Sequence, residues 1–110
     1  MVVKPLRAPR DRADGFRVYA EGTAAKPPVG YDYDLWVPEL APGRSLHSWW
    51  GEDHGKWEEF RIEYLSQLKG NPFLQRIVEA AGSGHITLLT ESSDPIRSPA
   101  AVLASVLRGR

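Results

Sequence analysis

A polar loop, Thr90–Ser98, carries the residues best suited to bind a ligand. It reads TESSDPIRS and so combines two carboxylates, three hydroxyl-bearing serines and an arginine. Arg97 can form a charge-assisted, bidentate contact with a carboxylate or phosphate. The loop runs into a helix predicted to begin at Ser98-Pro99, and the free N–H groups of a helix N-terminus favour an anion. We therefore predict a weak site for an anionic small molecule, formed by Glu91, Ser92, Ser93, Asp94, Arg97 and Ser98.

The same loop has a purely structural interpretation. Ser92, Ser93 and Asp94 are typical turn residues, and Ser98 is a typical helix N-cap. No glycine-rich phosphate cradle accompanies them. A surface loop with no ligand is therefore the alternative explanation of these residues.

Catalysis is the alternative function, and it would use the same loop. In this hypothesis Glu91 or Asp94 acts as acid or base and Arg97 anchors an anionic substrate. A serine nucleophile would instead need a histidine base, and His47, His54 and His85 lie in no recognised motif. We assign no catalytic residue.

Other polar and aromatic clusters favour structural roles. The run Glu52-Asp53-His54 matches no metal-ligand spacing, and Asp53 as a helix cap explains it more simply, so we predict neither a metal nor a cofactor. Three tryptophans between Trp36 and Trp50 are assigned to the core rather than to an exposed platform. The arginines at 7, 10 and 12 are assigned to a solvated turn.

Composition limits the class of partner. The chain has 110 residues, which predicts one domain over 1–110, and its 14 basic and 14 acidic residues cancel. We expect no nucleic-acid or membrane partner, which leaves a small molecule or another protein, and the oligomeric state is open. Cysteine is absent. The N-terminal residues lack the apolar core of a secretory signal, so a cytoplasmic location is expected.

The elements that must position the loop follow from periodicity and turn residues. Strands are predicted at 2–6, 16–20 and 85–90, with an edge strand or extended segment at 31–38. The glycines and prolines of residues 21–30 predict a loop there. Helices are predicted at 45–50, capped by Ser45, and at 56–69, 71–81 and 99–108. The apolar strand ending at Thr90 is expected at the centre. The result is an α/β fold with a small, at least partly parallel sheet covered by helices.

The order of several motifs resembles a known family. The segments DLWVPELAP (34–42), WWG (49–51), WEEFRIEY (57–64) and ITLL (86–89) resemble the YeaO-like branch of DUF488, a bacterial family of unknown function. Asp14-Gly15-Phe16-Arg17-Val18 is similar to an early motif of the same branch. The resemblance implies an α/β fold and supplies no activity.

Two departures from that pattern bear on function. The family's Asp-Arg-Leu-Trp-Pro-Arg motif is replaced by the residues at 19–25, YAEGTAA. Its late His-Asn-His run is replaced by Arg97, Ser98 and Pro99, although Asp94 matches. The resemblance therefore implies a scaffold whose polar motifs have changed, and we predict a non-catalytic binding or interaction module.

Overall fold

A parallel sheet organises the fold, as a computed structural model shows for residues 1–22 and 26–109. Its strands in the described chain are β1 (Val2–Pro5), β2 (Phe16–Tyr19), β3 (Leu35–Trp36) and β4 (Ile86–Thr90). They lie in the order β1-β4-β2-β3, and every pairing is parallel. The predicted central position of β4 is confirmed, because an apolar strand suits a place between two neighbours. The α/β fold class is confirmed as well.

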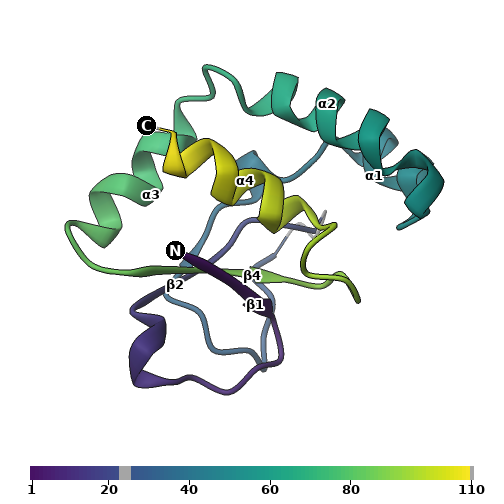
Figure 1. The fold of residues 1–110 in the computed structure, drawn as a ribbon. Coiled ribbons are helices and arrows are strands. Elements are labelled where there is room, and N and C mark those ends of the chain that lie inside the picture. The colour runs from purple at the N-terminus through teal and green to yellow at the C-terminus, as the bar shows by residue number, and fades with distance from the viewer. Residues whose placement is uncertain (23–25, 110) are drawn as a thin grey trace.

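The helices cover one face of this sheet (Figure 1). They are α1 (Arg44–Trp50), α2 (Trp57–Leu68), α3 (Phe73–Ala81) and α4 (Pro99–Arg108). Helix α4 packs on β1 and β4, α2 packs on α4, and α1 packs on α2. The main core lies between helices and sheet and includes Val18, Leu88, Phe60 and Leu103, none more than 1% exposed.

Connecting segments cover the opposite face (Figure 1). The links after β1 and β2 contain no α-helix in the residues described, so this face is covered by residues 6–15, which include a 3₁₀ turn at Arg12–Asp14, and by the loop at 26–34. A second apolar cluster forms beneath them from Leu6, Tyr19 and Leu89, with Tyr33 and Trp36 at its edge. In the described chain, the α-helices therefore cover one face of the sheet.

The N-termini of the helices can be compared with the predicted N-cap residues. Ser98 is the N-cap of α4, and its hydroxyl accepts the N–H of Ala101, as predicted. Asp53 caps a short 3₁₀ turn, His54–Lys56, that leads into α2. The predicted cap of α1 is wrong: the helix begins at Arg44, after Gly43, without a side-chain cap.

The assignment of all three tryptophans between Trp36 and Trp50 to the core is also partly wrong. Trp50 is 2% exposed, but Trp49 is 41% exposed and the Lys56 ammonium lies 5.1 Å from the centroid of its ring. Helix α1 packs on α2, and the side chains that it contributes to the core are those of Leu46 and Trp50, which are four residues apart on one face. Trp49 lies beside this face and points outward.

Part of the sequence prediction lies outside the described residues. The predicted loop at 21–30 and the altered family stretch at 19–25 both include residues 23–25. Among the helices of the described chain, none has the length and apolar character needed to cross a membrane.

Candidate ligand site

Strand ends bring three chain segments together at one edge of the sheet. Because β1, β2 and β4 are parallel, the residues after each strand emerge at the same edge, where open α/β sheets bind ligands. Pro5 is in register with Thr90, and the Leu6 N–H donates to the Thr90 carbonyl across 2.8 Å. The segments that start at Leu6, Ala20 and Glu91 therefore meet here.

Glu21 is a buried carboxyl group at this edge. It is 5% exposed, and its two oxygens accept the backbone N–H groups of Glu91 (3.1 Å) and Ala100 (3.0 Å). Burial disfavours the charged form of Glu21 and raises its pKa to about 7. Hydrogen bonds from Thr90 and from the two backbone N–H groups favour the charged form, but they do not outweigh burial. Glu21 lies in the predicted loop at 21–30 and is not among the predicted site residues. The sequence feature that could have identified Glu21 is its position as an acidic residue directly after the predicted strand at 16–20.

Glu52 approaches the predicted site from the turn after α1. One of its carboxylate oxygens accepts the Ser92 hydroxyl at 2.7 Å and the Ser93 N–H at 3.0 Å. The Ser92 hydrogen bond is the main reason that the pKa of Glu52 lies below its usual value. Glu52 adopts a φ of 61°, which is strained for a residue with a side chain. The protein's own carboxylate thus uses the anion-binding groups of Ser92 and Ser93.

The second half of the predicted site is also paired internally. Arg97 donates to Asp94 across 3.1 Å, and Asp94 further accepts the backbone N–H of Ile96. Partial burial opposes ionisation, but these hydrogen bonds leave the pKa of Asp94 below its usual value. Ser98 is fully buried and donates to the Pro95 carbonyl. The structure therefore keeps Asp94, Arg97 and Ser98 in one turn, and the Ser92 hydroxyl, 3.3 Å from the backbone N and O of Asp94, links this turn to the contact with Glu52.

A cleft of about 290 Å³ opens on the other side of Glu91. We call it the Arg7 cleft, and it is lined by Pro5, Leu6, Arg7, Tyr31, Thr90, Glu91 and Ser92. A hollow of about 490 Å³ adjoins it and shares Leu6, Arg7 and Tyr31. Arg7 is exposed and has no hydrogen bond or ion pair to any residue in the described parts of the chain. The sequence predicts only a solvated turn for Arg7, and the pairing of β1 with β4 is what places it beside Glu91.

A smaller cavity of about 120 Å³ lies towards α1. Its lining residues are Glu21, His47, Trp50, Glu52, Glu91, Ser92 and Pro99. Arg97 lines neither this cavity nor the Arg7 cleft. Of the predicted ligand residues, Glu91 and Ser92 line both.

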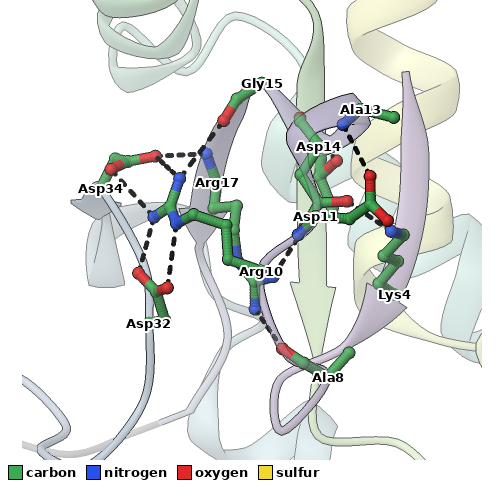
Figure 2. Close-up of polar contacts among 11 residues, drawn as sticks. Lys4, Ala8, Arg10, Asp11, Ala13, Asp14, Gly15, Arg17, Asp32 and Asp34 are labelled. Atoms are coloured by element: carbon green, nitrogen blue, oxygen red, sulfur yellow. Dashed lines mark hydrogen bonds and ion pairs between the residues drawn. The ribbon is translucent and has the colours of Figure 1, made fainter.

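Two other arginines near the N-terminus, Arg10 and Arg17, are engaged in ion pairs, as Figure 2 shows. Arg10 donates to both oxygens of Asp32 and of Asp34, at 2.7–3.1 Å. Arg17 has no exposed surface and donates to Asp14 at 2.8 Å and to the Ala8 carbonyl at 2.8 Å. Lys4 also pairs with Asp14. This network ties the loop 8–14 to β1 and β2 and explains why Arg7, rather than Arg10, is available.

Metal ligation finds no support in the geometry of the described residues. They contain no group of three or more histidine, aspartate and glutamate side chains placed to hold an ion. Glu52, next to Asp53 and His54 in sequence, instead contacts Ser92 and Ser93.

Comparison with known proteins gives one family and a small set of relatives. A family model described as the inactive DUF488-N3 subclade matches residues 1–110. The uncharacterized proteins Mb3100c of Mycobacterium bovis and Rv3073c of Mycobacterium tuberculosis are each 30% identical to the chain over 76 residues. That region is 69% of this chain and 64% of each relative. No solved structure matches significantly.

Proposed function

Because the chain belongs to the DUF488 family, with a match to its inactive DUF488-N3 subclade, we propose that it is a non-catalytic binding module for a small anionic molecule. A finer placement beside the YeaO-like branch is part of the proposal and is supported by the motifs at 34–42 and 57–64. The ligand binds in the Arg7 cleft, against Glu91 and Ser92 of the predicted site.

An unpaired arginine beside a cleft carries this proposal. Arg7 lines a cavity of about 290 Å³ at the carboxyl ends of β1 and β4 and has no polar partner in the described chain. Arg97, the anchor expected from the sequence, is bound to Asp94. A guanidinium group without an internal partner is the better anchor for an external carboxylate or phosphate.

The internal pairing of nearby carboxylates supports a non-catalytic role. Glu21 uses both oxygens to hold backbone N–H groups, and Glu52 binds Ser92 and Ser93. Asp94 binds Arg97 and its own turn. A general acid or base must reach the substrate, and these groups are instead committed to structure.

Anion titrations followed by NMR test the proposal. We expect acetate and phosphate, at constant ionic strength, to shift the backbone signals of Leu6, Tyr31 and Glu91 in a saturable way. Arg7→Gln removes the anchor and should abolish these shifts. Arg12→Gln is the matched control, since it removes the same charge from the same segment outside the cleft. Equal binding by wild type and Arg7→Gln would count against the proposal.

One observation favours the alternative, a small enzyme acting on an anionic substrate. Glu21 and Glu91 line the same 120 Å³ cavity, and the raised pKa of Glu21, about 7, suits proton transfer at neutral pH. A panel of phosphate and carboxylate esters tests it: turnover should disappear in Glu91→Gln and persist in Glu79→Gln on α3. If purified wild type turns over no member of the panel, this alternative loses its support.

A further inference from the structure

The Arg7 cleft carries charges of both signs that do not neutralise each other. Arg7 follows β1 and Glu91 follows β4, and the pairing of Pro5 with Thr90 places them at neighbouring positions of the same edge. Both side chains are exposed, and no ion pair joins them or links either to another described residue. A cation and an anion are therefore both available within one cleft.

Neighbouring groups hold Glu91 in place without neutralising it. Its backbone N–H is fixed by Glu21, and its carboxylate makes a hydrogen bond with the Tyr19 hydroxyl. Gly22 lies against this pair with a φ of 84°, and a Cβ there would come within 2.7 Å of the Tyr19 oxygen. The glycine leaves room for Tyr19 beneath Glu91, so the carboxylate is positioned at the cleft.

The remaining walls suit a short carbon chain. Pro5 and Tyr31 supply the apolar part of a lining that is otherwise mostly polar. The volume of about 290 Å³ corresponds to about ten water-sized groups. A molecule that carries only a negative charge would meet Arg7 favourably and Glu91 unfavourably, whereas an added ammonium group would turn the second contact into an ion pair.

We infer that the ligand of the Arg7 cleft is a zwitterion of the amino-acid class, with its carboxylate on Arg7 and its ammonium group on Glu91. The inference rests on the proposed function, because it names the ligand class of the same cleft. Tyr31 and Pro5 cover the intervening methylene groups.

Three probes with one carbon skeleton test the inference: 4-aminobutyrate, butyrate and butylamine, titrated by NMR at pH 7 and constant ionic strength. We expect 4-aminobutyrate to bind about fivefold more tightly than butyrate, the gain of one exposed ion pair. Butylamine should bind more weakly than both. Amino acids from glycine to 6-aminohexanoate then show which charge separation fits best.

Exposed variants separate this inference from the proposed function. In Glu91→Gln, the preference for 4-aminobutyrate over butyrate should disappear, whereas Arg7→Gln should lose both ligands. Glu79→Gln and Arg12→Gln carry the matching charge changes elsewhere and should behave as wild type. If butyrate and 4-aminobutyrate bind wild type equally and both need Arg7, the zwitterion inference fails and the anion site stands. If no probe shifts a cleft signal, both fail.

Discussion

Arg17 is a charged residue with no exposed surface, and its partner Asp14 is equally buried. Lys4 and the backbone N–H of Asp11 also bind Asp14, and the Lys4 contact is the main reason that its pKa lies below the usual range. We predict that Arg17→Met, which keeps the apolar stem, lowers the free energy of unfolding by about 3 kcal/mol. The loss arises because Asp14 stays buried with one cation instead of two. Urea denaturation measures it.

An exposed pair provides the control for Arg17. Arg61 contacts Glu58 on the surface of α2, where solvent screens the interaction. Arg61→Met should therefore change the midpoint of urea unfolding far less than Arg17→Met does. Similar shifts for the two variants would show that the buried network contributes no more than a surface contact.

Glu21 should make stability depend on pH. Its pKa is raised from 4.5 to about 7 in the folded protein, so the folded state binds the proton more tightly than the unfolded state. The resulting stability is fully present below about pH 4.5 and is lost as the pH rises through about 7. We predict that wild type loses about 3 kcal/mol over this range relative to Glu21→Gln, whose side chain does not titrate.

The comparison between wild type and Glu21→Gln isolates this effect. Asp14, Asp94 and Glu52 have lowered pKa values, so their contributions are lost only as the pH falls through the acidic range. Urea denaturation at several pH values gives the difference, and parallel curves for the two proteins would show that Glu21 stays ionised in the fold.

At the scale of elements, α4 depends on its first turn. The Ser98 hydroxyl accepts the Ala101 N–H at 3.1 Å and donates to the Pro95 carbonyl at 2.8 Å, while Glu21 accepts the Ala100 N–H. We predict that Ser98→Ala lowers the free energy of unfolding by about 1 kcal/mol. Ser105→Ala, in the interior of the same helix, is the control. Alanine is the better helix former there, so stability should hold or rise slightly.

The same contrast shows how far the sequence predicts this fold. Ser98-Pro99 is a local signal, and it correctly predicts where α4 begins. The apolar composition of the strand that ends at Thr90 indicates burial on both faces, and it correctly predicts a central place in the sheet. Weaker local signals mislead: Ser45 resembles a cap, but α1 begins one residue earlier.

The candidate site was less predictable because tertiary contacts build it. Sequence places Glu91, Ser92 and Ser93 at a strand end, but nothing local shows that Glu52, about forty residues away, binds the serines. Glu21 reaches the start of α4 across a separation of 79 residues. Arg7 meets Glu91 only through the register of β1 on β4. The residue types in the loop predict ligand binding, but the order and register of the strands determine which polar side chains are free to contact a ligand.

At the scale of the molecule, the sheet separates two kinds of packing. The helix face holds the larger apolar core, and the loop face holds the ion pairs of Arg17 and Arg10 beside the cluster of Leu6, Tyr19 and Leu89. The Arg7 cleft lies at the carboxyl-terminal edge of the sheet, where the segments after β1 and β4 begin. Substitutions in the proposed site can therefore change its chemistry without disturbing the helical core.

This division predicts a gradient of local stability, which hydrogen exchange can measure. Strand β4 is hydrogen-bonded on both sides and its Leu88 and Leu89 are about 1% exposed, so its amides should exchange only when the whole molecule unfolds. Amides in residues 6–10 should exchange through smaller openings, since one strand and one ion-pair network hold that segment. Arg17→Met should speed exchange in β4 by the factor that matches its loss of global stability. If β4 amides exchange faster than those in the middle of α2, the sheet is not the most stable part of the fold and the gradient is wrong.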